Sequence, residues 1–198
     1  MTDSVYRRAL GSEFENLDES LRGYFGGDPA ARPGIGSGSF DVAGSQRSRL
    51  APLLRFLGWR RILFPEFERD VPFDIVNTPN SDGSLDARRT LRFASGRVRV
   101  LEDTMRVVDG RLHDFLGTRR GLEARFALEV EDGLLLMRSD RLWLHLGSAR
   151  IRLPRLATVT VAESWSAGRQ HVDVRLRSPV LGEWFRYAGS FNYRYEER

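Results

Sequence analysis

Apolar and polar residues alternate with a period of two from Arg69 almost to the end of the chain. A period of two places successive side chains on opposite faces of a β-strand. One such segment sets Leu122, Ala124 and Phe126 against Glu123. We therefore expect most of the chain to form strands with one apolar face and one polar, solvent-exposed face.

Turn signals that contain glycine divide this region into segments of hairpin length. They are Asp82-Gly83, Ser95-Gly96, Asp109-Gly110, Asp132-Gly133, Ala167-Gly168 and Leu181-Gly182. The segments between them are too short for crossover helices, so we expect antiparallel strands and not the parallel sheets that bind nucleotides at a switch point. A flat sheet of this size would leave long unprotected edges, so the pattern predicts a barrel or a highly curved sheet.

The first 34 residues show a helical pattern followed by a loop. Apolar residues recur at helical spacing from Val5 to Tyr24, and a segment rich in Gly and Pro follows at residues 26–38. These glycines run into a strand and not into a helix, so we interpret them as a structural turn or bulge and not as a dinucleotide-binding loop. We expect the N-terminal helices to pack on the sheet and close one mouth of the barrel.

A second helical pattern lies between residues 50 and 58, where Leu50, Leu53, Leu54 and Leu57 repeat at i, i+3, i+4 and i+7. The fold class that we expect is α+β, with a highly curved antiparallel β-sheet or barrel of about nine or ten strands. We expect a single domain over residues 1–198. It would have an N-terminal helical segment and loop at 1–34, and a strand, short helix and antiparallel β-meander at 35–198.

The composition excludes several classes of site. The chain has no cysteine, which excludes disulfides, thiol catalysis and iron–sulfur clusters. His113, His145 and His171 lack metal-ligand spacing, so we expect surface histidines and no metal or cofactor. No apolar run approaches the ~20 residues of a membrane span, and no signal-peptide core is present, so we expect a cytoplasmic protein.

All 31 basic residues are arginine, which is typical of a high-GC genome and inflates the isoelectric point. Acidic residues are interspersed among these arginines, and a mixture of signs on a strand face is typical of solvation and cross-strand pairing. We therefore do not expect a nucleic-acid partner.

Charged residues in the apolar phase of a strand mark the candidate site, because a buried charge needs a partner or a use. Arg89 shares the apolar phase of Leu91, and Glu163 shares that of Val161. Glu102 follows Val98 and Val100 in phase, but the apolar phase then switches, so a bulge would decide whether Glu102 faces inward.

Three interpretations of these charges remain open. They could form an ion-pair network across the barrel. Alternatively, Arg89 could bind a ligand carboxylate or phosphate, while Glu102 or Glu163 holds its guanidinium or accepts from a ligand hydroxyl. A carboxyl group with a raised pKa would also suit a general acid or base. No nucleophile motif accompanies these residues, so catalytic residues are not identified and we do not expect an enzyme.

The last strand carries a row of aromatic residues in one phase: Phe185, Tyr187, Phe191, Tyr193 and Tyr195. Such a row can fill a core or line a cavity. We expect Trp165, Phe185, Tyr187 and Phe191 to line the wall of a binding site, because flat, stiff rings offer a large apolar surface.

Three segments resemble one family in order along nearly the whole chain. They are "VYRRALGSEF", "GIGSGSFDVAGSQRSRLAPLLRFLGW" and "VDVRLRSPVLGEWFRYAGSF", and they resemble the family of domain of unknown function 4166. The resemblance implies a domain that occurs alone or beside a reductase resembling saccharopine dehydrogenase, in a small-metabolite or lipid context. It implies no catalytic residue, and this chain would be a stand-alone member without the reductase portion.

The sequence thus favours a module that binds a small hydrophobic or amphipathic molecule inside its barrel, with Arg89, Glu102, Glu163 and the aromatic wall as candidate ligand-binding residues. One alternative is a structural or interaction domain that partners a separate reductase through exposed apolar residues. The candidates for that surface are Trp59, Leu63, Phe64 and Phe67. The other alternative is a carboxylate-dependent enzyme.

Overall fold

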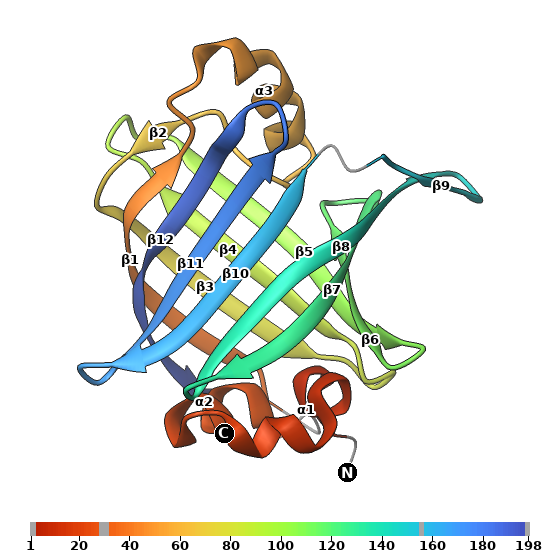
Figure 1. Cartoon of the computed structure of the whole chain (residues 1–198). Coiled ribbons are helices and arrows are strands. Elements are labelled where there is room, and N and C mark those ends of the chain that lie inside the picture. Colours follow the sequence, from red (N-terminus) through yellow and green to blue (C-terminus); the bar gives the residue numbers. More distant parts are fainter. Residues whose placement is uncertain (1–2, 28–31, 155–156, 197–198) are drawn as a thin grey trace.

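The computed structural model describes residues 3–27, 32–154 and 157–196. Its centre is a closed barrel of ten antiparallel strands with helices at both mouths (Figure 1). The barrel strands are β1 (Gly34–Gly44), β3 (Val71–Pro79), β4 (Leu85–Arg92), β5 (Val98–Val108), β6 (Arg111–Leu116), β7 (Leu122–Glu131), β8 (Leu134–Leu146), β10 (Thr158–Ser166), β11 (Arg169–Ser178) and β12 (Gly182–Tyr195). The expected α+β fold with a curled antiparallel sheet is confirmed.

The barrel strands follow one another in chain order, and each pairs with its neighbour in the sequence of barrel strands. The barrel closes where the last strand, β12, pairs with the first, β1. Two short strands lie outside this path. Strand β2 (Phe67–Glu68) pairs with the end of β1, and β9 (Ala149–Arg152) pairs with the end of β8. The meander expected from the turn spacing is therefore the real topology.

Strand β8 changes its partner along its length. Its first part, Leu135–Arg138, pairs with β10 and closes the wall, whereas Trp143–Leu146 pairs with β9. The β8–β9 hairpin consequently leaves the barrel and projects to one side (Figure 1).

Three hairpin turns explain why the sequence signals were reliable. Asp109, Asp132 and Ala167 have φ values of 50°, 48° and 49°, and each precedes a glycine that also has a positive φ. Positive φ at both central positions is the geometry of a type I′ turn, whose twist matches that of the flanking strands.

The glycines at the start of β1 lie within the strand and not in a turn. A Cβ on Gly38 would lie 2.1 Å from the carbonyl oxygen of Ser190 and 2.6 Å from the Cβ of Phe191. The absence of a side chain therefore lets β12 approach β1 closely and lets the Phe191 ring occupy the interior. The bulge that we expected in this region occurs further along β1, between Phe40 and Val42.

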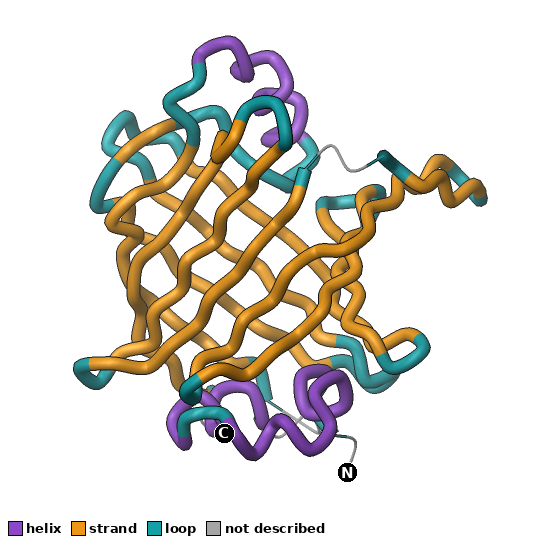
Figure 2. The backbone as a smooth tube through the Cα atoms, viewed as in Figure 1, coloured by secondary structure: helices purple, strands orange, loops and turns teal. Residues whose placement is uncertain are grey.

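The N-terminal helices cover one mouth of the barrel (Figures 1 and 2). They are α1 (Val5–Leu10), the 3₁₀ turn Gly11–Asn16 and α2 (Glu19–Gly26). Ser4 caps α1 by accepting from the backbone N–H of Arg7, and Asp18 caps α2 by accepting from that of Ser20. Phe14 and Leu21 are fully buried against the barrel, so this end is closed by apolar packing, as expected.

The opposite mouth lies beneath α3 (Ala51–Trp59), which follows the 3₁₀ turn Ser48–Leu50. Leu54 is buried on its inner side, and Pro52 lies in the first turn, where the missing N–H costs no hydrogen bond. Among the described residues, no helix is both long enough and apolar enough to span a membrane.

Candidate functional site

A cavity of about 370 Å³ lies inside the barrel between the two groups of helices. Its lining is mostly apolar and comes from nearly every barrel strand. Tyr6 and Tyr24 line it from the N-terminal helices, and Leu53 and Leu57 line it from α3. The cavity therefore reaches from one mouth of the barrel to the other.

An ion pair interrupts this apolar lining. Arg89 on β4 and Asp103 on β5 both point into the cavity, and Arg89 Nη1 lies 2.5 Å from Asp103 Oδ1. Burial lowers the pKa of Arg89, but nearby groups, of which the negative charge of Asp103 has the largest effect, raise it by more. The resulting pKa is well above the ordinary value. The guanidinium thus keeps its charge inside the barrel.

A second aspartate, Asp114 on β6, lies near this pair. Its neighbour across the ladder is Met105, two residues after Asp103 on β5. Burial, and then the negative charge of Asp103, raise the pKa of Asp114 well above its ordinary range. This carboxyl group therefore favours its protonated form, in which it can both donate and accept a hydrogen bond.

Glu163 lines another part of the cavity, from β10. Its Oε2 accepts a hydrogen bond from Gln170 Nε2 on β11. Burial raises the pKa of Glu163 to about 7, and the Gln170 hydrogen bond and the more distant charge of Arg89 only partly offset this effect. Glu163 thus lies inside, as predicted, but it is Asp103 and not Glu163 that holds the guanidinium.

Tyrosine hydroxyls complete the polar groups of the interior. Tyr6 donates to Met105 Sδ at 3.2 Å, and Tyr24 accepts from Asn77 Nδ2 at 3.2 Å. Tyr187 lines the cavity from β12, and burial raises its pKa to about 12. These hydroxyls stay protonated over the whole physiological range of pH.

Two acceptor atoms of the cavity-lining carboxyl groups have no hydrogen-bond partner within the described residues. They are Asp103 Oδ2 and Asp114 Oδ1, and both atoms are inaccessible to solvent. Buried polar atoms are usually hydrogen-bonded, because an unpaired one costs about 1–3 kcal/mol. The missing partners therefore make the protonated form of the Asp114 carboxyl group less costly to bury than a second negative charge.

The predicted wall residues divide into two groups. Tyr187 and Phe191 line the cavity, as expected. Phe185 does not line it, because its ring packs in the solid core 5.0 Å from that of Phe64. Trp165 also does not line it, since it lies at the end of β10 with 37% of its surface exposed.

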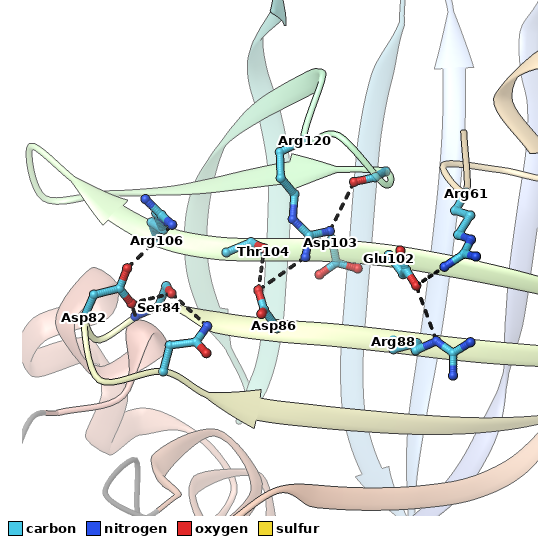
Figure 3. A network of polar contacts seen from close by, with 12 residues as sticks. Arg61, Asp82, Ser84, Asp86, Arg88, Glu102, Asp103, Thr104, Arg106 and Arg120 are labelled. Carbon is cyan, nitrogen blue, oxygen red and sulfur yellow. Dashed lines mark hydrogen bonds and ion pairs between the residues drawn. The ribbon is translucent and has the colours of Figure 1, made fainter. Parts of the chain in front are cut away.

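Glu102 borders the cavity, but its carboxylate pairs with arginines other than Arg89. It bonds to Arg61 at 2.5 Å and to Arg88 at 3.4 Å, within a network along the outer faces of β4 and β5 (Figure 3). The ladder between these strands has no register shift, so Asp103 takes the inward phase and Glu102 the outward one. The phase of Val98 and Val100 was misleading, because these valines are not buried.

The same outer network continues toward α1 (Figure 3). Asp86 accepts from Thr104 Oγ1 at 2.5 Å and from Arg120 at 3.4 Å, and Asp82 forms an ion pair with Arg106 at 3.5 Å. These groups are satisfied by one another, so this network is part of the barrel wall and not a binding site.

Sequence reasoning missed Asp103 and Asp114, although a signal was present. Asp103 lies in the phase of Leu101 and Met105, and Asp114 in that of Leu112. Arg89 was selected as a charged residue in the apolar phase of its strand. Asp103 and Asp114 meet the same criterion once the apolar phase of β5 is taken from Leu101 and Met105 and not from Val98 and Val100.

The expectation of surface histidines was wrong for His113. Its ring is buried, and its Nδ1 lies 2.6 Å from Glu123 Oε1 on the outer face of the barrel. His145 and Arg150 also bond to Glu123, at 2.6 and 2.5 Å. Burial raises the pKa of this carboxylate, but the three donors lower it by more, to about 2. Within the described ranges, no group of His, Asp and Glu residues has the geometry of a metal site.

The apolar surface predicted for an interaction domain is only partly exposed. Trp59 and Phe67 are accessible, whereas Leu63 and Phe64 are buried in the core. The period of this segment was unclear in the sequence because it is a loop that returns from α3 to the barrel.

Comparisons with known proteins identify a family and one uncharacterized relative, and they give no activity. The family model described as Domain of unknown function (DUF4166) matches residues 17–191. The uncharacterized protein YndH of Bacillus subtilis is 30% identical over 151 residues, which cover 70% of this chain and 73% of that protein. No solved structure matches the chain.

Proposed function

We propose that this chain, which belongs to the family Domain of unknown function (DUF4166), binds a small hydrophobic or amphipathic ligand inside its barrel. The observation that carries the proposal is the coincidence of an apolar cavity with a charged ion pair, Arg89–Asp103, in its lining. A volume of about 370 Å³ lies within the range of about 300–1,000 Å³ that is typical of small-molecule sites.

The lining suggests where each part of the ligand would lie. An apolar body would contact side chains such as Ile75, Phe126 and Phe191. A polar head would lie beside Arg89 and Asp103. A hydroxyl group suits this position, because it can accept from the N–H groups of Arg89 that the ion pair leaves unused.

The protonation state of Asp114 supports the same chemistry. A protonated Asp114 adds a donor beside the charged pair and adds no second negative charge that would repel an oxygen-rich head. An amphipathic alcohol, or a molecule with a hydroxylated head group, is therefore the ligand class that we favour.

A carboxylate-dependent enzyme is the second candidate, and one observation favours it. Glu163 lines the same cavity with a pKa raised to about 7, which suits a general acid or base near neutral pH. If the bound molecule is converted, Glu163→Gln should abolish turnover without abolishing binding. If the domain is only a binding module, that substitution should leave the ligand unchanged and bound.

The proposal is tested by native mass spectrometry of the protein purified from its own host, followed by organic extraction. Val161→Phe adds a ring to the cavity wall, and Thr160→Phe adds the same ring to the neighbouring position of β10, where the alternation of the strand directs it outward. We expect a bound small molecule in the wild type and in Thr160→Phe, and its loss in Val161→Phe. A wild-type protein without bound mass, or retention of the molecule in Val161→Phe, would contradict the proposal.

A further inference from the structure

Helix α3 exposes apolar side chains at the mouth of the cavity. Leu53, Phe56 and Trp59 are 46%, 56% and 69% exposed, while Leu54 and Leu57 pack on the inner side of the same helix. A helix that is apolar all round is normally buried. Within the described ranges, nothing therefore covers the apolar side chains on the outer face of α3.

The turn between β11 and β12 extends this surface. Val180 and Leu181 at its tip are 91% and 37% exposed. The turn lies beside α3 (Figure 1), and Arg47, in the segment that leads to this helix, donates through its Nη2 to the carbonyl oxygen of Leu181 at 2.6 Å. We call Leu53, Phe56, Trp59, Val180 and Leu181 the rim patch.

The rim patch is continuous with the interior. Leu53 and Leu181 are exposed to solvent and also line the cavity. The cavity therefore opens between α3 and the β11–β12 turn, and a molecule that enters or leaves there passes over the rim patch.

The charges on the α3 side of the patch are of one sign, whereas on the side of β12 the carboxylate of Glu183 is paired with Arg175 and Arg177. Residues 45–62 contain Arg47, Arg49, Arg55, Arg60 and Arg61 and no acidic residue. In the part of the chain that the structure describes, only Arg61 of these five forms an ion pair, with Glu102. Four arginines on or next to the exposed apolar helix thus have no carboxylate paired with them among the described residues.

We propose that the rim patch docks on the surface of an anionic lipid bilayer, with Phe56 and Trp59 inserted at the interface and the arginines against the lipid head groups. An exposed apolar helix with flanking arginines has the character of an interfacial helix, and tryptophan prefers the boundary between head groups and acyl chains. In this orientation the mouth of the cavity faces the membrane, so an amphipathic ligand can pass between bilayer and barrel.

A second copy of the chain fits the patch less well. In a two-fold dimer the same surface meets itself, so the arginines of one copy would face those of the other. The charge of an anionic bilayer complements that of the patch, whereas a dimer would bring like charges together.

Vesicle flotation tests the proposal directly. The probes are vesicles of phosphatidylcholine alone and vesicles of equal parts phosphatidylcholine and phosphatidylglycerol. We expect the protein to float with the anionic vesicles and to be released as the salt concentration rises. Phe56→Ser/Trp59→Ser should lower the partition coefficient by more than about tenfold. Both side chains are largely exposed, so these substitutions should leave the fold intact.

Two matched control variants test whether vesicle binding depends on the rim patch or on exposed apolar and charged residues in general. Leu146→Ser/Ile151→Ser removes exposed apolar residues from the β8–β9 hairpin and should leave flotation unchanged. Arg49→Glu/Arg55→Glu should weaken flotation by more than about tenfold. Arg111→Glu/Arg194→Glu makes the same change of net charge at the other end of the barrel and should not weaken it comparably.

The docking proposal can fail independently of ligand binding. It would be overturned if the wild type did not float with anionic vesicles, or if Phe56→Ser/Trp59→Ser floated as well as the wild type. A concentration-dependent dimer that this variant abolishes, without vesicle binding, would assign the patch to a second copy and overturn it too. Neither result would bear on whether a small molecule binds inside the barrel, which is tested separately by native mass spectrometry.

Discussion

Arg89 and Asp103 form a 2.5 Å ion pair inside the barrel, and the residues one position before each of them, Arg88 and Glu102, form a 3.4 Å pair on the outside. The two pairs lie on the same two strands, β4 and β5. They differ in burial, because Asp103 is 2% exposed whereas Arg88 is open to solvent. Substitutions of the inner pair can therefore be compared with the same substitutions of the outer pair as a control.

Breaking the inner pair should cost far more stability than breaking the outer pair. Arg89→Met leaves Asp103 buried without a counter-charge, so we expect a loss of about 3–5 kcal/mol in the free energy of unfolding. Arg88→Met should cost less than about 1 kcal/mol, because the outer pair is solvated. Urea unfolding measures both values. Equal losses would contradict the assignment of Arg89 and Asp103 to the interior.

Removing both members of the inner pair should restore most of that loss. In Arg89→Met/Asp103→Leu no buried charge is left unpaired, and apolar replacements of buried ion pairs are often neutral or stabilising. We expect this double variant to be more stable than Arg89→Met alone by about 2 kcal/mol or more. A double variant as unstable as the single one would mean that the charges do not face each other.

Glu163 should make stability fall as the pH rises. Its folded pKa of about 7 lies above its ordinary value of 4.5, so folding favours the protonated form. The resulting stabilisation is fully present below about pH 4.5 and is lost as the pH rises to about 7. Glu163→Gln cannot ionise, so at about pH 8 it should be more stable than the wild type by up to about 3 kcal/mol. The difference should vanish near about pH 4. Urea unfolding across this range measures it, and a constant difference would refute the buried carboxyl.

Glu123 should have the opposite pH dependence. Its folded pKa of about 2 lies below its ordinary value of 4.5, so its stabilisation is present above about pH 4.5 and is lost as the pH falls toward about 2. Glu123→Gln should lower the free energy of unfolding by about 2 kcal/mol at neutral pH. This value allows for the solvent that screens Arg150. The variant should lose no further stability from this position on acidification. Acid unfolding followed by circular dichroism distinguishes the two proteins. Identical acid midpoints would contradict the His113–Glu123–His145 cluster.

Gly38 should tolerate no side chain. A Cβ at this position would lie 2.1 Å from the Ser190 carbonyl oxygen, a backbone atom that can move only if β12 moves. We expect Gly38→Ala to destabilise by about 1–3 kcal/mol or more, whereas Ser37→Ala, at the exposed neighbouring position, should be near neutral. Thermal unfolding measures both. A neutral Gly38→Ala would contradict the close approach of β12 to β1 at this position.

The barrel could be predicted from the sequence because the patterns that indicate its strands and turns involve only residues close together in the chain. Alternation by two and turns such as Asp109-Gly110 depend only on neighbouring residues and on the φ values that they permit. Local patterns do not show which face of a strand points into the barrel where both phases contain apolar residues. This is why Glu102 and Asp103 could not be assigned to a face before their ladder with β4 was known.

The lining of the cavity was predicted only in part, for a related reason. Arg89, Glu163, Tyr187 and Phe191 were found because their strands have one unambiguous phase. Whether an inward ring meets a cavity or another ring depends on residues far along the chain, as Phe185 shows by packing on Phe64. Similarly, Glu123 accepts hydrogen bonds from residues of β6, β8 and β9, and no spacing in the sequence predicts that these residues lie together.

The most direct test of interior ligand binding compares the two pairs in one measurement. Native mass spectrometry of Arg89→Met/Asp103→Leu and Arg88→Met/Glu102→Leu, each purified from the host, reports the fraction of molecules that carry a bound small molecule. We predict that the inner double variant loses the molecule, because its polar head loses its partners, and that the outer double variant keeps it at the wild-type level. Equal occupancy in both variants, or an equal loss in both, would contradict a binding site built around Arg89 and Asp103.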